Sequence, residues 1–463
     1  MLRLRTRYFL PAFSAFAAVL GLSTLGACAD ARHARNGTEP AEPAAGQEPE
    51  ARSAADAEKL AALQRKVDEI SPRVAELRGM QFKHPVPAGI HTPDEFLEFA
   101  KKDLESEMSI EQFNAMGEAL ALFGLVDGDS SLFDTVMELL RGQVGGYYDP
   151  KTKKFYMIST FNEGMLADII MAHELTHALD DQYYDLAKMM EGTSDNMDRQ
   201  FAIRAVVEGS GTSLMNLYTV QGMMKGWISM QPEDMEAMQE MMEEQMEQIQ
   251  DAPPFLVITL ALPYMEGNKL LVRNSSMLAA ATLTPKAEDL DHAFRNPPSS
   301  SEQVLHFDKY WDPGQRDEPA PVELPDLSAQ VGAGWKLAYS DTLGELGCYF
   351  LVIEELPDLM SSFSGMGPPL TDPSSEGWDG DRFQLYTGPG GAKVLVWASV
   401  WDTPDEASEF AAALAAVAQP RTPALRRVAE TSGGVLALFA NEAGTAVLER
   451  TRLALAAAAP RWN

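Results

Sequence analysis

The chain has 463 residues and a formal net charge of −31, and 45% of its residues are hydrophobic. This length and apolar content allow two or three domains with sizeable cores. So large an excess of acidic groups argues against a nucleic-acid ligand and against attachment to anionic lipid through a basic patch.

The N-terminus has the features of an exported bacterial lipoprotein. Basic residues precede an apolar stretch over residues 9–25, and Leu-Gly-Ala-Cys, which resembles a lipobox, ends at Cys28. A membrane-spanning anchor is the alternative, but the stretch is short and Pro11 interrupts it. We expect a signal peptide and lipobox over residues 1–28, and attachment of the mature chain to the bacterial cell envelope through lipidated Cys28. Ala29, which directly follows the cysteine, does not resemble an inner-membrane retention signal, so the outer membrane is favoured over the inner membrane.

Composition divides the rest of the chain. Residues 29–53 are rich in Ala, Glu, Pro and Gly, and we expect them to form a disordered tether. A mainly helical domain is expected over residues 54–311, a proline-rich linker over 312–330 and a second domain over 331–463. The second domain alternates helix and strand patterns, so the predicted fold class of the chain is α+β.

Helical patterns dominate the first domain. Val67 and Ile70 belong to a stripe on one helix face, and Pro72 is expected to end or kink that helix. Further helices are expected over residues 94–141. They lead into residues 146–158, which are predicted to form two strands around an Asp-Pro turn.

The sequence His-Glu-Leu-Thr-His, from His173 to His177, carries the most specific chemistry. Residues i and i+4 of an α-helix lie on one face, so both imidazoles can bind one metal ion. Glu174 can then accept a proton from a metal-bound water. An apolar stripe that includes Met165 and Ile169 precedes the motif at helical spacing and predicts a mostly buried helix.

A zinc site of this kind needs a third protein ligand. Glu208 is preferred, because an apolar run precedes it in a second helical segment, Arg199–Val220. A carboxylate in such a position is unfavourable to bury unless it is paired or binds a metal. Asp180 and Asp181 are better placed to orient an imidazole, and Glu191 is expected in a loop.

These residues resemble the gluzincin zinc metallopeptidases. The resemblance rests on the His173–His177 motif with the Ala-Leu-Asp-Asp-Gln that follows it, and on Val-Glu-Gly around Glu208. Within that class the chain is similar to a group of secreted bacterial lipoprotein metallopeptidases of unassigned substrate. Residues 144–150 are similar to the Gly-x-Tyr-Asp-Pro hairpin of that group, and residues 297–310 are similar to its Pro-x-Ser-x-Glu-Gln-x-Leu-His segment. The resemblance covers roughly residues 78–310. It implies a mainly helical, zincin-like catalytic domain with a small β-hairpin or sheet, a Zn²⁺ cofactor, and Glu208 as the third ligand.

Two positions depart from the pattern of that class. Gluzincins often carry an Asp where this chain has Thr212, and that Asp holds a zinc-binding histidine. The related group tends to have an acidic residue where this chain has Ser210. Orientation of the histidines is then expected from Asp180, Asp181 or a backbone carbonyl.

Peptide hydrolysis also needs a donor, besides the metal, for the oxyanion that forms from the scissile carbonyl. His306 and Tyr310 are the candidates, because both lie in a segment similar to that of the related group. A surface or interdomain role is the alternative for His306. Tyr147, Tyr148 and Tyr183 are further candidates.

The resemblance also suggests which strand binds the substrate backbone. Residues 155–159 are expected to be the exposed strand edge beside the active helix, and a core hairpin strand is the alternative. A methionine-rich helix with seven acidic residues is expected over residues 231–250. We interpret it as a lid or packing helix, and a copper site is the alternative.

The second domain carries no visible cluster of metal ligands or nucleophiles. Its expected elements are a helix over 343–356, strands over 383–386 and 392–400, a helix over 405–418, a hairpin around 433–434 and a helix over 445–459. Cys348 is expected to be a buried apolar residue. Substrate positioning, partner binding and a purely structural role all stay open for this domain.

The sequence therefore predicts zinc-dependent hydrolysis of a peptide or protein substrate, with His173, His177 and Glu208 as ligands and Glu174 as general base. The alternative is a catalytically silent gluzincin-like lipoprotein that binds a peptide or an envelope partner. The intact Glu174 favours the enzyme.

Overall fold

The computed structural model describes residues 49–463 except 144, 161–163, most positions between 230 and 250, and 354–369, 418–424, 432–433, 459–460 and 463. The predicted leader and lipobox, and nearly all of the tether, lie outside the described residues. So does most of the predicted methionine-rich helix.

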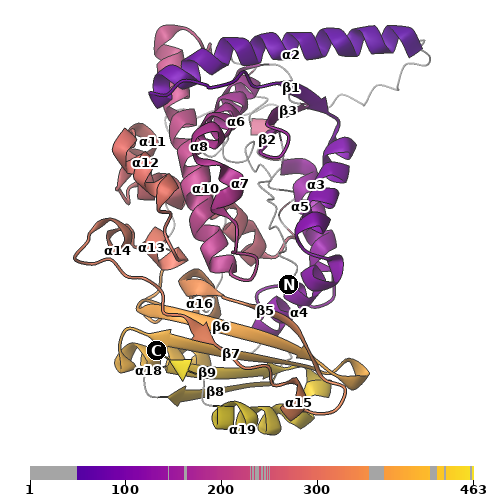
Figure 1. The fold of residues 1–463 in the computed structure, drawn as a ribbon, viewed down its shortest axis with the longest axis vertical. Coiled ribbons are helices and arrows are strands. Elements are labelled where there is room, and N and C mark those ends of the chain that lie inside the picture. Colours follow the sequence, from indigo (N-terminus) through magenta and orange to yellow (C-terminus); the bar gives the residue numbers. More distant parts are fainter. Residues whose placement is uncertain are drawn as a thin grey trace, which may run out of the picture.

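Helices build the first two thirds of the described chain, and a β-sheet with flanking helices builds the last third (Figure 1). The α+β fold class is therefore as predicted. The helical half contains α2 (Pro49–Arg78), α3 (Pro93–Glu107), α4 (Ile110–Phe123), α5 (Leu132–Gln143), α6 (Met165–Tyr184), α7 (Leu186–Met189), α8 (Met197–Lys225), α10 (Pro254–Val272), α11 (Met277–Thr282), α12 (Ala287–Arg295), α13 (Ser301–Leu305) and α14 (Phe307–Trp311).

Helix α2 lies across the end of the helical half that is farthest from the C-terminal sheet (Figure 1). It continues through Pro72 to Arg78, so of the two expected outcomes Pro72 does not end this helix. Ile70 and Val74, on either side of the proline, are fully buried in a cluster with residues of α6 and α8. That burial offsets the roughly 3 kcal/mol that a proline costs inside a helix.

A three-stranded sheet lies beside α6. Its strands are β1 (Ala88–His91), β2 (Gly146–Asp149) and β3 (Lys154–Ile158), in the order β1-β3-β2. The predicted hairpin is confirmed, since β2 pairs with β3 in antiparallel register. The prediction that residues 155–159 form an exposed edge is wrong, because β1 pairs with β3 on its other side. The alternative, a core strand, is correct, and the edges of this sheet are β1 and β2.

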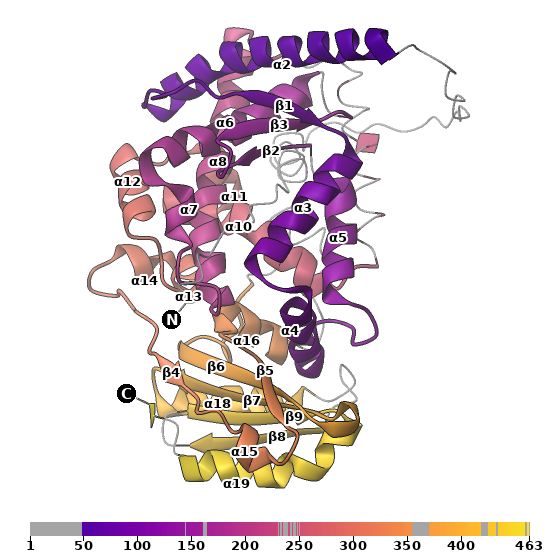
Figure 2. The same cartoon turned by 45° about the vertical axis from the view of Figure 1, so that its right-hand side comes forward.

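Helix α10 has the length and apolar content of a membrane span, with a mean hydropathy of 1.3, and among the described residues it alone does. In the fold, 72% of that stretch is buried. The helix packs along α8 in the centre of the helical half (Figures 1 and 2). We therefore describe α10 as a core helix.

The C-terminal domain is built on a five-stranded antiparallel sheet in the order β5-β6-β7-β9-β8. Its elements and the linker strand are β4 (Val322–Glu323), α15 (Ser328–Val331), β5 (Lys336–Asp341), α16 (Gly344–Val352), β6 (Trp378–Thr387), η1 (Pro389–Gly391), β7 (Lys393–Trp401), α18 (Pro404–Ala416), β8 (Leu425–Thr431), β9 (Gly434–Ala440), η2 (Glu442–Val447), α19 (Leu448–Ala458) and β10 (Arg461–Trp462). The two hairpins and three helices predicted for this domain are confirmed, whereas β4, β5 and β10 were not predicted. Cys348 is buried and free, as expected.

The two faces of this sheet are covered differently. Phe123 of α4 packs edge-on against Phe383 and Trp397, so the helical half lies directly on one face together with α16 and α18. Helices α15 and α19 cover the other face, around Tyr386 and Val396. The alternation of these residues along the strands follows the period of two of a β-strand.

Buried acids join the two halves where α8 begins. The Met197 N–H donates to Asp341 at 2.7 Å, and the Ser301 N–H donates to Asp198 at 2.9 Å. Gly344 lies directly against Asp198, because a Cβ at that glycine would be 1.9 Å from the Asp198 Oδ1. The first turn of α8 is therefore fixed to the C-terminal domain.

The pKa of Asp198 makes this joint sensitive to pH. Burial raises that pKa to about 7, although hydrogen bonds from Ser301 oppose the rise. The folded protein keeps the Asp198 proton up to about pH 7, whereas the unfolded chain loses it near pH 4. The free energy of unfolding should therefore fall as the pH rises through this window, by up to about 4 kcal/mol from this group. Below about pH 4 both states are protonated and the effect is absent.

Asp198→Asn should remove this contribution. Its free energy of unfolding relative to wild type should improve between about pH 4.5 and about pH 8, as measured by urea denaturation at both values. Asp127→Asn, at an exposed loop position, is the matched control and should show a constant difference. A constant difference for Asp198→Asn as well would contradict the assignment.

Candidate metal centre

His173 and His177 on α6 converge with Glu208 on α8, and all three side chains are buried. The Glu208 Oε2 lies 3.2 Å from the His173 Nε2 and 3.3 Å from the His177 Nε2, and the two Nε2 atoms are 2.9 Å apart. Zinc ligands about 2.0–2.1 Å from a tetrahedral ion are separated from one another by about 3.3 Å. The three donor atoms therefore fit three corners of a zinc site.

The electrostatics of the three groups fit the same interpretation. Burial opposes ionisation of Glu208, but the charges and hydrogen bonds of the two histidines outweigh it and lower the pKa of Glu208 to about 2. Burial also opposes protonation of His177, yet Glu208 raises the pKa of His177 to about 9. Without a metal, His177 is therefore expected to carry a proton next to the ionised Glu208. A metal ion that binds here must displace that proton.

Two glycines of α8 allow the helices to approach this closely. A Cβ on Gly211 would lie 2.6 Å from the imidazole of His173, so that ring packs against the backbone of α8. A Cβ on Gly209 would lie 2.3 Å from the backbone of Gly267, which shows that α8 and α10 cross in backbone contact next to Glu208. Because glycine has no side chain, it permits approaches that any other residue would block.

Helix α10 adds an aromatic ring to the centre. The ring of Tyr264 stacks on His173, with centroids 5.7 Å apart and an interplanar angle of 26°. Tyr264 is buried, and the α8–α10 crossing at Gly209 brings it to this position. The sequence did not single out Tyr264. The apolar run of α10 identifies a core helix, but its rotation about α8 is set by the crossing.

Asp180 and Asp181 connect α6 to neighbouring elements through hydrogen bonds. Asp180 accepts hydrogen bonds from Arg78 at 2.9 Å and from Ser210 at 2.7 Å, and so links α6 to α2 and α8. Asp181 accepts hydrogen bonds from the Tyr148 hydroxyl and from Lys153, both at 2.7 Å. These partners are not the histidines, so neither acid orients an imidazole as was expected.

The outer nitrogens of the two histidines have no hydrogen-bond partner among the described residues. The Nδ1 atoms of His173 and His177 are both buried and unbonded, and so is the Thr212 hydroxyl. The expectation of a backbone carbonyl at either Nδ1 is therefore not met. Packing against Gly211 and Tyr264 holds the His173 ring instead.

Glu174 follows the first ligand on α6 and is buried. Its Oε2 accepts a hydrogen bond from the backbone N–H of Tyr148 on β2 at 2.8 Å. Phe155, opposite Tyr148 in the hairpin, donates its N–H to Pro87 on the far side, so the N–H of Tyr148 points away from β3. The outer edge of β2, on the side away from β3, therefore faces α6.

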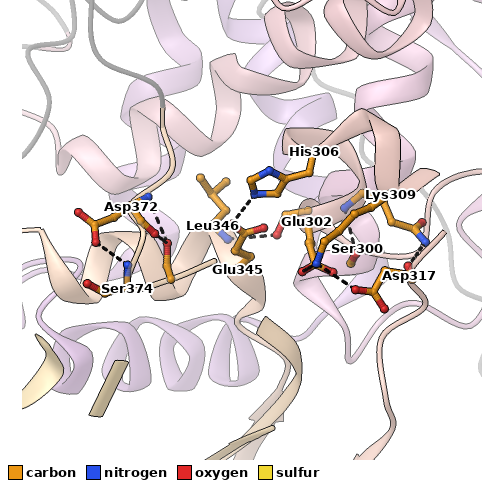
Figure 3. A network of polar contacts seen from close by, with 12 residues as sticks. Ser300, Glu302, His306, Lys309, Asp317, Glu345, Leu346, Asp372 and Ser374 are labelled. Carbon is orange, nitrogen blue, oxygen red and sulfur yellow. Dashed lines mark hydrogen bonds and ion pairs between the residues drawn. The ribbon is translucent and has the colours of Figure 1, made fainter. Parts of the chain in front are cut away.

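The structure does not bring His306 and Tyr310 to the ligands. The His306 Nε2 lies 2.8 Å from a carboxylate oxygen of Glu345 on α16 (Figure 3). Tyr310 is buried and its hydroxyl donates to the backbone oxygen of Asn296 at 2.7 Å. No hydrogen bond, ion pair or ring contact joins either residue to the three ligands in the described part of the chain. This arrangement favours the interdomain alternative for His306.

The other tyrosines considered as donors are also engaged. The Tyr147 hydroxyl lies 2.8 Å from the Nδ1 of His91, and the Tyr183 hydroxyl donates to the Gln81 carbonyl at 2.8 Å. The Tyr148 hydroxyl donates to Asp181. Among these three, only Tyr148 is also connected to the centre, through its backbone N–H.

A second group of acids, Glu302, Asp317 and Asp402, is close enough to hold a cation. An ammonium group already lies among them. The Lys309 Nζ is 2.6 Å from Glu302, 2.9 Å from Asp317 and 3.3 Å from Asp402, and Figure 3 shows its contacts with the first two. This group is therefore an ion-pair cluster that joins the helical half, the linker and the C-terminal domain.

Comparison with known families gives one match, in the C-terminal domain. Residues 334–458 match the family described as Domain of unknown function (DUF8575). No curated protein and no solved structure matches the chain. The matched residues do not include His173, His177 or Glu208.

Gly211→Ala tests how the helix approach supports the centre. The added methyl group overlaps the imidazole of His173 and should displace it. We expect zinc affinity to fall by about tenfold or more, since a displaced ligand loses its geometry. Equilibrium competition with a chelator measures this. Gly128→Ala, whose Cβ would meet only Ala121 at 3.6 Å, should bind zinc as the wild type does, and equal affinity in both variants would argue against this role of Gly211.

Proposed function

We propose that this protein is a zinc-dependent peptidase of the gluzincin type. The observation that carries the proposal is the convergence of three buried donor atoms, within 3.3 Å of one another, beside Glu174. His173 and Glu208 are 35 positions apart in the chain. A chance His-Glu-x-x-His match has no reason to meet a buried carboxylate from another helix at this distance.

In this proposal His173, His177 and Glu208 bind zinc, and Glu174 moves the proton. Zinc, when bound, lowers the pKa of a coordinated water to about 7. Glu174 accepts the proton of that water and passes it to the leaving amine. The N–H of Tyr148 holds one oxygen of Glu174, so the carboxylate keeps its orientation relative to the imidazoles.

Two variants test the metal centre. Glu208→Ala should lose zinc, because two histidines are left to hold it. Glu174→Gln should keep zinc but cleave peptides about 10²- to 10⁴-fold more slowly, because the amide cannot accept a proton. Metal content is measured by mass spectrometry of the purified protein, and cleavage with a quenched fluorescent peptide library.

Glu191→Gln is the matched control for the second variant, because Glu191 is exposed in a loop. It should keep both zinc and activity. Wild-type protein that binds no zinc, or Glu174→Gln that cleaves at the wild-type rate, would be incompatible with the proposal.

We also propose that the peptidase is held at the outer membrane by lipidated Cys28, on the evidence of the N-terminal sequence. Cys28→Ser should prevent lipid attachment. The full-length protein should then lose incorporation of radiolabelled palmitate and leave the membrane fraction, while Cys348→Ser should retain both. Palmitate labelling of Cys28→Ser at the wild-type level would show that this cysteine is not the attachment site.

A further inference from the structure

A cavity of about 230 Å³ lies between the helical half and the C-terminal domain. Its walls come from α3, α4 and α5, from the first turns of α8 and α10, and from β5 and α16 of the C-terminal domain. We propose that this cavity is a specificity pocket that receives bulky apolar side chains of the polypeptide substrate. The inference rests on the peptidase function proposed above and adds the class of substrate.

The cavity and the metal centre share the same faces of two helices. On α8, Arg204 lines the cavity and Glu208 follows one turn later. On α10, Leu260 lines the cavity, and one turn later comes Tyr264, which stacks on His173. Residues i and i+4 lie above one another on a helix, about 6 Å apart along its axis. On both helices the cavity therefore begins about one turn from a residue of the candidate metal centre.

The lining selects apolar groups. Leu120 and Leu140 of the helical half and Leu256 of α10 are buried in the wall. Half-buried methionines such as Met116 and Met197 also line it, and their flexible side chains adapt to ligands of different shape. Burial of an apolar side chain in such a wall is favourable, whereas a polar one loses its hydrogen bonds to water.

The volume limits the size of the ligand. An apolar cavity of about 150 Å³ holds one benzene molecule in another protein. By proportion, this cavity holds roughly nine non-hydrogen atoms. That corresponds to two leucine-sized side chains or to one large aromatic side chain.

The carboxylates at the floor of the cavity are held by the protein. Asp341 accepts hydrogen bonds from the N–H of Met197 and from the hydroxyl of Tyr339. Asp198 accepts the N–H of Ser301. These two carboxylates serve the joint between the domains, so they are engaged by the protein and not by a ligand. Arg204 is the basic residue among those that line the cavity, and most of the other lining side chains are apolar, so the pocket is expected to select chiefly by size and apolar character.

The C-terminal domain supplies part of the wall. Tyr339 of β5 and Leu346 of α16 line the cavity, as does Leu343 just before α16. Figure 2 shows α16 and β5 where the sheet meets α4 and the lower ends of the helical half. The domain thereby takes a direct part in substrate selection.

The test compares two fluorescent peptides that differ in one pair of residues, Leu-Leu against Ser-Ser. In the wild-type full chain, kcat/KM should be at least about tenfold higher for the Leu-Leu peptide. Leu260→Trp fills the cavity and should abolish this preference while zinc content is unchanged. Met116→Trp fills it from the opposite wall and should do the same, so the test does not depend on one variant folding. Leu337→Trp, at a half-buried position of β5 outside the lining, is the control and should keep the preference.

Binding separates this inference from the peptidase proposal. The same peptides are titrated into the Glu174→Gln full chain by fluorescence anisotropy, so no cleavage is needed. Tighter binding of the Leu-Leu peptide, lost on adding Leu260→Trp or Met116→Trp but kept with Leu337→Trp, supports the pocket even if no peptide is cleaved. Cleavage of both peptides at equal rates with equal binding overturns the pocket and leaves the peptidase intact. Binding of decanoate in place of either peptide would show a lipid site and would also overturn the inference.

Discussion

The metal centre depends on how closely three helices can approach along one short stretch of α8. Glu208, Gly209, Ser210 and Gly211 are consecutive, and each serves a different contact. Glu208 meets the histidines, Gly209 admits the backbone of α10, Ser210 bonds to Asp180, and Gly211 admits the ring of His173. Each glycine costs about 1 kcal/mol within a helix. That cost is offset by burial of the crossing helices. Because the glycines let the helices approach closely, the donor atoms of His173, His177 and Glu208 lie within 3.3 Å of one another.

The buried carboxylates near the candidate metal centre differ in how their charge is compensated. Asp180 is paired with Arg78, and Asp181 with Lys153, so these buried carboxylates have cationic partners. Glu208 differs, since its ion-pair partners among the described residues are the two histidines. The high pKa of His177 lets a proton on that ring offset the charge of Glu208, a role that a metal ion would take over if one bound here.

Local patterns in the sequence were sufficient to predict much of the fold and to single out the three residues that converge at the candidate metal centre. The apolar stripe before His173 and the apolar run before Glu208 each identify a buried helix without knowledge of the rest. Contacts between distant segments were not predictable in this way. The pairing of β1 with β3, which makes β3 a central strand, joins residues far apart in the chain. The position of Tyr264 depends on a helix crossing, and the distance of His306 from the centre depends on how the domains pack.

Helix α8 links the C-terminal domain to the chemistry in a further sense. Its first turn is hydrogen-bonded to Asp341 and packs against Gly344. Glu208 follows eleven residues after Met197, which is about 16 Å along the helix axis. A helix is stiff over this length, and one end of α8 is fixed to the C-terminal domain. A rotation of that domain against the helical half would act on the first turn of α8, whereas Gly209 and Ser210 hold the turn that carries Glu208 against α10 and α6. Helix α8 is therefore held at its first turn by a domain that contributes none of the three converging residues, and around Glu208 by its contacts with α6 and α10.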